Sequence, residues 1–174
     1  MSLNPDTKEA IKNARAKDKI RILFVCLGNI CRSPAAQGIF QARVDSAGDA
    51  ARFEIDSAGT GGWHIGDLPD HRMRVHASRR GYDLTHRARQ FKATDFDDFD
   101  LIVAMDGSNR YDLLAAARTV DDRKKIIMMG DFITRNPRFD HIPDPYYEGS
   151  EGFELVLDLL EDASENLYNA LTAK

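Results

Sequence analysis

Cys26 and Arg32 are the first residues whose types and spacing suggest chemistry, because only five residues separate the thiol from the guanidinium. A thiol beside a guanidinium and a helix N-terminus ionises more readily than a free thiol, whose pKa is about 8.5. We therefore expect Cys26 to be a thiolate, the nucleophilic form, at neutral pH. Arg32 carries a planar guanidinium that can hold two phosphate oxygens at once. The pair predicts a phosphate site with a nucleophile at its base.

The segments on either side of this loop predict how the site is positioned. Residues 20–25 form an apolar run rich in β-branched and aromatic side chains, which is typical of a buried strand. Ser33 stands where a helix N-cap belongs, and Pro34 where the first helical residue belongs. A strand, a tight loop and a helix N-terminus aim several backbone N–H groups at one point, which favours an oxyanion. Gly28 permits close approach of the backbone, and Asn29 tolerates a left-handed conformation.

The string Val25-Cys-Leu-Gly-Asn-Ile-Cys-Arg-Ser-Pro34 resembles the phosphate loop of the low-molecular-weight protein tyrosine phosphatases. Further strings resemble that family in the same order: Asp56-Ser-Ala-Gly-Thr60, Trp63-His-Ile-Gly66, His86-Arg-Ala-Arg-Gln90, Met105-Asp-Gly-Ser-Asn109 and Asp144-Pro-Tyr-Tyr147. Other large families of cysteine phosphatases carry a histidine immediately before the cysteine, where this chain has Val25. The resemblance covers residues 19–174. It implies a phosphatase that hydrolyses protein phosphotyrosine and small aryl phosphates through a phosphocysteine intermediate, without a metal.

Asp144 is the candidate acid, because displacing a phenoxide from phosphorus requires a proton for the leaving oxygen. It lies between Pro143 and Pro145, which stiffen the loop. By itself, an aspartate in a proline-rich loop is more often a turn residue than a catalyst. The resemblance implies that Asp144 protonates the leaving phenol and then accepts a proton from the water that attacks the phosphocysteine.

The resemblance also implies supporting roles for other polar residues. Asp106, which suits a helix start, is expected to support Arg32 and the loop. Ser57 and His86 are expected to hold Asn29 and the loop backbone. Ser33 can donate a hydrogen bond to the thiolate. The phosphate-binding loop then comprises, besides Cys26 and Arg32, residues Leu27, Gly28, Asn29, Ile30, Cys31 and Ser33.

Aromatic residues are candidates for the walls of the substrate cleft. Tyr146 and Tyr147 follow the acid, and together with Trp63 they could enclose a flat phenyl ring. A deep aromatic slot, which the resemblance implies, would select phosphotyrosine over phosphoserine. The alternative for Trp63, which lies in a glycine-rich loop, is a ring folded onto the protein surface. His64 and Leu27 are expected to tune the choice of substrate.

Cys31 has two possible roles. It is either a small buried filler or a resolving thiol that forms a reversible disulfide with Cys26. A metal site is not expected, because only two thiols are available and no paired histidines lie nearby. We expect no cofactor.

The composition limits the class of protein and of partner. The chain has 174 residues, 43% of them hydrophobic and 30% charged, which is typical of one globular domain. Its net charge of -4 argues against general binding to nucleic acid or to an anionic membrane. Two cysteines without a secretory segment favour a reducing, cytoplasmic location. Expected partners are phosphotyrosine-containing proteins, with inorganic phosphate as product, and the chain is expected to be a monomer or weak dimer.

Periodicity predicts the organisation of the chain. Residues 1–18 are polar with little to bury and are expected to form a mobile or loosely docked extension, followed by the phosphatase domain at 19–174. Apolar runs at 20–25, 52–57, 101–105 and 125–129 alternate with helical segments. This order predicts an α/β domain with a four-stranded parallel sheet flanked by helices on both faces. The resemblance makes this fold flavodoxin-like, of the phosphotyrosine phosphatase I type. Arg79, Arg80, Arg87 and Arg89 are expected on a solvated surface.

Two rival functions share part of this pattern. Arsenate reductases built on the same loop use further cysteines downstream, and no cysteine follows Cys31. A non-catalytic phosphotyrosine-binding module is expected to lose the nucleophile or the acid, yet Cys26, Arg32 and Asp144 are all present. The sequence therefore favours the phosphatase.

Overall fold

The four apolar runs form one parallel sheet in a computed structural model that describes residues 2–145 and 149–174. The strands are β1 (Ile20–Cys26), β2 (Phe53–Gly59), β3 (Leu101–Ala104) and β4 (Ile126–Met128). Their spatial order is β2-β1-β3-β4, and every neighbouring pair is parallel. The predicted four-stranded parallel sheet is confirmed, although β2 runs two residues farther than expected, to Gly59.

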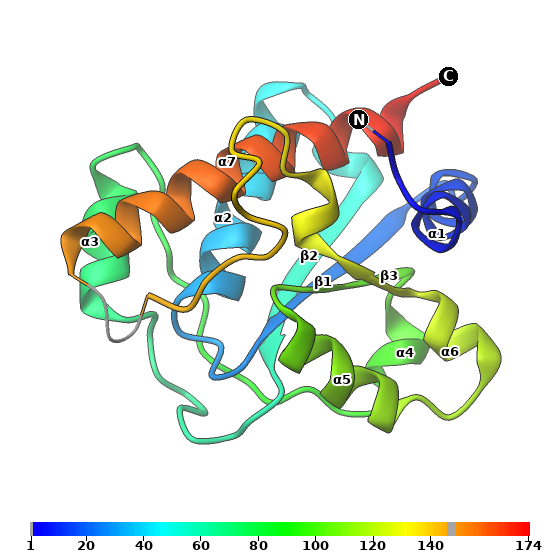
Figure 1. Cartoon of the computed structure of the whole chain (residues 1–174), viewed down its shortest axis with the longest axis horizontal. Helices are drawn as coiled ribbons and strands as arrows, with labels where there is room; N and C mark the ends of the chain where they lie inside the picture. The colour runs from blue at the N-terminus through cyan, green and yellow to red at the C-terminus, as the bar shows by residue number, and fades with distance from the viewer. Residues whose placement is uncertain (1, 146–148) are drawn as a thin grey trace.

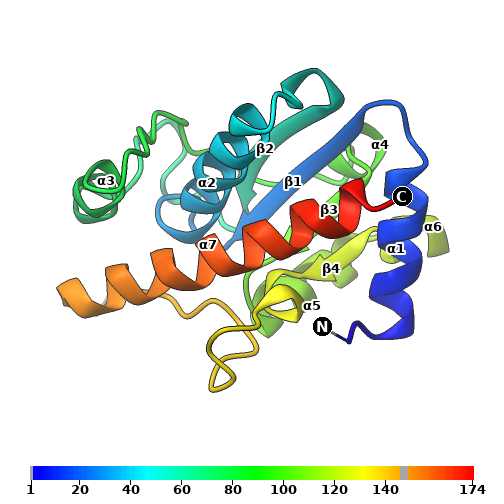
Figure 2. The same cartoon turned by 90° about the horizontal axis from the view of Figure 1, so that it is seen from above.

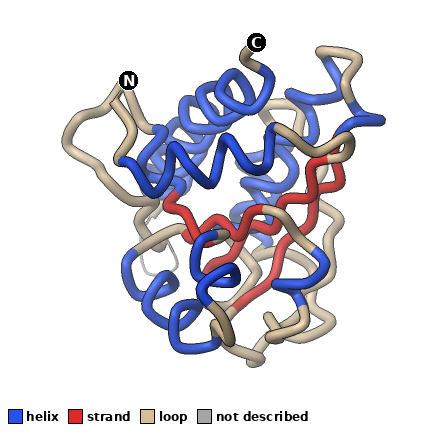
Figure 3. Tube along the Cα trace, turned by 90° about the vertical axis from the view of Figure 1, so that its right-hand side faces the viewer, coloured by secondary structure: helices blue, strands red, loops and turns tan. Residues whose placement is uncertain are grey.

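Helices cover both faces of this sheet, so the strands form the middle layer (Figure 3). One face carries α1 (Pro5–Arg15), α2 (Arg32–Ser46) and α7 (Ser150–Thr172), which lie in front of the strands in Figure 2. The other face carries α4 (Asp95–Asp98) and α5 (Gly107–Ala116). Away from the two faces lie α3 (His71–Ser78), which packs on α7, and α6 (Val120–Lys124) beside β4, with 3-10 turns η1 (Ala50–Arg52) and η2 (Met129–Phe132) (Figure 1).

Strand β1 is buried on both of its faces, as expected for the centre of a parallel sheet. Ile20, Ile22 and Phe24 point into the core shared with α2 and α7. Leu23 and Val25 point into the smaller core that contains Phe96 of α4 and Leu113 of α5. This alternation fixes the register of β1 and therefore the place where its carboxyl end delivers Cys26.

The end of β1 is also the point at which the chain connections diverge. β2 flanks β1 on one side and β3 on the other, so the loops that leave the sheet there open a crevice. The loop of residues 26–32 and the start of α2 lie in that crevice. The topology thus places the candidate nucleophile at the ligand-binding edge of the sheet.

The N-terminal segment is a docked helix, which contradicts the expectation of a mobile or loosely docked extension. In α1 the residues Thr7, Ala10, Ile11 and Ala14 are buried, and they pack near β4 and α7. Thr7 Oγ1 also donates to Asp131 Oδ2 at 2.9 Å. The apolar stripe is short and consists mainly of alanines, so its burial depends on surfaces that only the fold supplies.

Arg79 and Arg87 are exposed, as expected, whereas Arg80 and Arg89 are only partly exposed and form ion pairs. Arg80 follows α3 and forms ion pairs with Glu154 and Glu161 on α7. Arg89 joins Asp56, in the middle of β2, to the buried Asp95 of α4, with N–O distances of 3.1 Å in both pairs. The ion pairs of Arg80 therefore link the end of α3 to α7, and those of Arg89 link β2 to α4.

No helix in the described ranges is long and apolar enough to cross a membrane.

Candidate active site

Helix α2 begins two residues earlier than its sequence suggests. Its first residue is Arg32 and its N-cap is Cys31, so the prediction of an N-cap at Ser33 and a first helical residue at Pro34 is wrong. The Ser33 hydroxyl lies 2.9 Å from Cys26 Sγ and accepts a hydrogen bond from Asn29 Nδ2 at 2.8 Å. Because these side chains occupy the hydroxyl, it does not cap the helix.

The backbone of the loop is folded so that its carbonyl oxygens point outward. Cys26 O and Leu27 O accept from the N–H groups of Thr60 and Gly61 at 2.9 Å, and Ile30 O accepts from Asp70 N at 2.7 Å. Within the part of the chain that the structure describes, the N–H groups of residues 28–32 donate no hydrogen bond. These donors and the N-terminus of α2 remain available for an anion.

Gly59, at the end of β2, allows the loop to lie this close to the sheet. A Cβ added there would stand 2.7 Å from Leu27 O and 3.0 Å from Asn29 N, so any larger residue would displace the loop. The sequence analysis did not single out Gly59 as a site residue, although it belongs to the Asp-Ser-Ala-Gly-Thr string. Its role follows from a contact between two strand ends.

Asn29 is the residue that holds the loop in shape. It has a left-handed backbone with φ 56° and is 1% exposed. Its Nδ2 donates to Ser33 Oγ and, at 3.0 Å, to Ser57 Oγ, and its Oδ1 accepts from the N–H of Arg89. His86 Nε2 lies 3.1 Å from the same Oδ1, so it serves as a second donor. All four hydrogen-bonding positions of the amide are therefore used.

The surroundings of His86 favour its neutral state. Burial lowers the pKa of His86, and the nearby Arg89 lowers it further, while the Asp56 carboxylate opposes both. With Nε2 carrying the proton toward Asn29, the neutral ring acts as a donor. Gln37, which sequence reasoning missed, completes the network by accepting from Ser57 Oγ at 2.6 Å.

Arg32 is almost entirely buried and is oriented by two groups. Its Nη1 donates to Asp106 Oδ2 at 2.6 Å and to the carbonyl of Ile142 at 3.0 Å. Its Nη2 lies 3.7 Å from Asp144 Oδ2. Asp106 also caps α5, with Asn109 as its capping-box partner. The Ile142 carbonyl is a contact that no motif in the sequence predicts.

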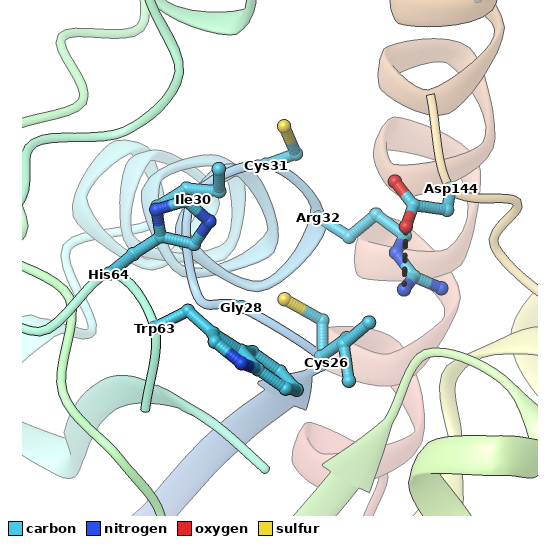
Figure 4. A pocket seen from close by; sticks show the side chains of 9 residues that line it. Cys26, Gly28, Ile30, Cys31, Arg32, Trp63, His64 and Asp144 are labelled. Atoms are coloured by element: carbon cyan, nitrogen blue, oxygen red, sulfur yellow. Dashed lines mark ion pairs between the residues drawn. The ribbon is translucent and has the colours of Figure 1, made fainter. Parts of the chain in front are cut away.

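Cys26, Arg32 and Asp144, the candidate nucleophile, phosphate-binding residue and acid, line one cavity of about 220 Å³ (Figure 4). Trp63 and His64 form its other wall, and both side chains face it from the glycine-rich loop after β2. The Trp63 ring covers Gly61, where a Cβ would stand 1.8 Å from Cζ3. The ring lies against its own loop and also lines the cavity, and its role as a wall for a substrate stays a prediction.

Two further residues, Tyr146 and Tyr147, were predicted to form walls of the substrate cleft. Tyr146 and Tyr147 lie outside the described residues. Asp144, two residues earlier, is described and is about half exposed at the cavity.

Cys31 is buried and also lines the cavity, and both cysteines have free thiols. Burial strongly raises the pKa of the Cys31 thiol, and the charges of Asp70, Cys26 and Asp144 raise it further. At neutral pH this thiol therefore stays protonated. Among the described residues, no group of three histidine, cysteine, aspartate or glutamate side chains is placed to hold a metal ion.

The sequence of this chain is similar to those of known phosphatases. A family model described as low molecular weight phosphotyrosine protein phosphatase matches residues 21–174. A low molecular weight protein-tyrosine-phosphatase of Streptomyces coelicolor is 43% identical over 152 residues, which cover 87% of this chain and 93% of the relative.

Solved structures of phosphatases share the fold of this chain. The crystal structure of a protein tyrosine phosphatase from Entamoeba histolytica, with Hepes in its active site, has a TM-score of 0.83 and 43% identity, covering 86% of this chain and 95% of that one. A structure of an arginine phosphatase from Drosophila has a TM-score of 0.82 and 32% identity, covering 89% and 99%.

Proposed function

Because the chain belongs to the low molecular weight phosphotyrosine protein phosphatase family, we propose that Cys26, Arg32 and Asp144 carry out its hydrolysis of protein phosphotyrosine. The phosphate enters the loop of residues 26–32, where Cys26 Sγ attacks phosphorus and displaces the phenol oxygen. Asp144 gives its proton to that oxygen, so the phenol leaves neutral. The product of this step is a phosphocysteine.

Water completes the reaction. Asp144, now a carboxylate, takes a proton from a water molecule that attacks phosphorus on the side the phenol has left. The S–P bond breaks, inorganic phosphate leaves and the Cys26 thiolate is regenerated. In both steps, the negative charge of the equatorial oxygens is stabilised by the Arg32 guanidinium, the loop N–H groups and the N-terminus of α2.

The single observation that supports this assignment is the meeting of three groups around one cavity. The sulfur, the guanidinium and the carboxylate come from the end of β1, the start of α2 and the loop before α7, and all three line it (Figure 4). Asn29 and Asp106 support these groups, acting on the loop backbone and on Arg32. Trp63 and His64, with Tyr146 and Tyr147, are the proposed walls for the substrate ring.

Release of inorganic phosphate from a phosphotyrosine peptide tests the assignment. We expect turnover in the presence of chelator and none in Cys26→Ser, because a serine hydroxyl is a far weaker nucleophile at neutral pH. Turnover that depends on added metal, or that survives in Cys26→Ser, would contradict the mechanism. Phosphoarginine is the competing substrate to include, since a structural neighbour is an arginine phosphatase. We expect the flat ring to be preferred at a cavity lined by Trp63.

The surroundings of the enzyme follow from the same chemistry. A catalytic thiol requires a reducing compartment, which favours the cytoplasm. Residues 19–174 form the phosphatase domain, preceded by the extension that carries α1. The net charge of -4 argues against nucleic acid and anionic membranes as partners, and the state in solution is a monomer or weak dimer.

A further inference from the structure

Exposed apolar side chains of this molecule are concentrated beside the cavity. Six large apolar side chains are exposed among the described residues. Four of them lie in the loop of residues 26–32 or in the segment 63–68. These four are Leu27 (41% exposed), Trp63 (72%), Ile65 (62%) and Leu68 (36%). The other two, Tyr111 and Val120, lie on α5 and α6. Single exposed apolar residues are ordinary, whereas a cluster beside a cleft indicates a binding surface.

In the sequence, Ile65 and Leu68 lie between two places where the chain contacts the candidate active site. At one point Trp63 and His64 line the cavity. At the other, Asp70 N donates to the carbonyl of Ile30 in the phosphate loop. Ile65 and Leu68 do not line the cavity themselves, but both are exposed and follow Trp63, which does line it, within five residues; we call these two side chains the apolar shelf.

The shelf is held in place by the backbone. Gly66 N donates to Ala88 O, Ala88 N donates to Asp67 O, and Asp67 N donates to His64 O, each at 2.8 Å. Gly66 has a φ of +87°, which makes the turn between Ile65 and Leu68. Both side chains are therefore presented to solvent by a fixed turn, and their ordering costs little when a ligand binds.

We propose that Ile65 and Leu68 bind an apolar side chain of the substrate polypeptide, one to three residues away from the phosphotyrosine. This rests on the proposed function. A phosphotyrosine side chain inserted into the cavity brings its flanking residues over the rim. An extended chain advances about 3.3 Å per residue, so the three residues on either side of the phosphotyrosine extend roughly 10 Å from it. Because the shelf belongs to the same segment as Trp63 and His64, which line the cavity, we take the substrate polypeptide as its occupant.

Phosphotyrosine peptides test this directly. One series carries leucine or serine at each of the three positions on either side of the phosphotyrosine, and kcat/KM is measured relative to p-nitrophenyl phosphate. We expect leucine to raise kcat/KM about fivefold at one or two positions, from partial burial of one side chain. Ile65→Ser and Leu68→Ser should remove that preference. Val120→Ser, an aliphatic residue of similar exposure on α6, is the matched control and should retain it.

The outcomes separate this inference from the function on which it rests. Equal kcat/KM for the leucine and serine peptides at every position would overturn the shelf, even with normal turnover of p-nitrophenyl phosphate. An unchanged preference in both shelf variants would also overturn it. A shift from dimer to monomer in Ile65→Ser, with the peptide preference intact, would assign the shelf to a second copy of the chain. Absence of turnover on any phosphotyrosine substrate would instead remove the proposed function.

Discussion

Asp106 joins Arg32 to the start of α5 through the two oxygens of one carboxylate. Oδ2 accepts from Arg32 Nη1 at 2.6 Å, and Oδ1 accepts from Asn109 N at 2.8 Å. The guanidinium of the phosphate site is thereby fixed to a helix that follows β3. Because β3 pairs with β1, the Cys26 thiol and the Arg32 guanidinium are positioned by the same sheet.

Asp106→Asn should lower kcat/KM for all aryl phosphates by about 10- to 100-fold, because a charge-assisted hydrogen bond contributes about 1.5–3 kcal/mol. The asparagine oxygen can still cap α5, so the fold should persist. Steady-state kinetics with p-nitrophenyl phosphate and phosphotyrosine check this. Asp98→Asn, at an exposed position of α4, is the control. Unchanged kinetics would mean that Arg32 is oriented without Asp106.

Asp144→Ala should slow phosphotyrosine hydrolysis by about 100- to 1,000-fold, which lies within the roughly 100- to 10,000-fold that general acid catalysis contributes. The loss should be smaller for aryl phosphates whose phenols are more acidic, because these leave without a proton. A series of substituted phenyl phosphates measures the dependence on the leaving group. An equal loss for every substrate would remove the acid role.

His86 should make stability depend on pH below about 6.5. Burial lowers the pKa of His86 in the folded chain beneath 6.5, the value for the unfolded chain. As the pH falls through 6.5, the unfolded chain therefore binds the proton first, and the free energy of unfolding decreases until folded His86 is protonated as well. Urea unfolding from pH 7 to about pH 5 should show a steeper decrease for wild type than for His86→Gln. Glutamine can still donate to Asn29, and parallel curves would contradict the expectation.

Ile11→Ala should lower the free energy of unfolding by about 2–4 kcal/mol, the usual cost of removing a buried aliphatic side chain. Ile11 is 4% exposed in α1, so the loss reports whether this helix is docked in solution. Lys12→Ala, one residue later on the exposed side of α1, is the control. If the two variants unfold at the same urea concentration, α1 is not part of the cooperative fold.

Cys31 should protect Cys26 against lasting oxidation. Peroxide converts the Cys26 thiolate to a sulfenic acid, which Cys31 condenses with to form a disulfide and water. Activity regained after dithiothreitol should therefore be higher in wild type than in Cys31→Ser. Because burial raises the pKa of the Cys31 thiol, this protection should grow as the pH rises. Identical recovery of the two proteins would leave Cys31 as a buried filler.

The sequence by itself predicted the four strands and the helices α2, α3, α5 and α7 in their order along the chain, and it marked residues 26–32 as a candidate phosphate loop. Both are local properties: the apolar run of β1 is continuous, and Cys26 and Arg32 are separated by a single tight turn. A short motif carries its own geometry because few backbone paths connect a strand to a helix in so few residues. The family resemblance then extended this to Asp144 and Asp106, which lie more than seventy residues away.

Only the tertiary structure decided which surfaces these residues meet. Ser33 looked like an N-cap, but its hydroxyl is occupied by Cys26 and by Asn29. The sequence predicted that Arg80 and residues 1–18 face solvent. In the structure, carboxylates of α7 form ion pairs with Arg80, and apolar side chains of α7 cover part of α1. Hydrogen bonding and burial depend on partners brought from distant parts of the chain, and local patterns contain no information on those partners.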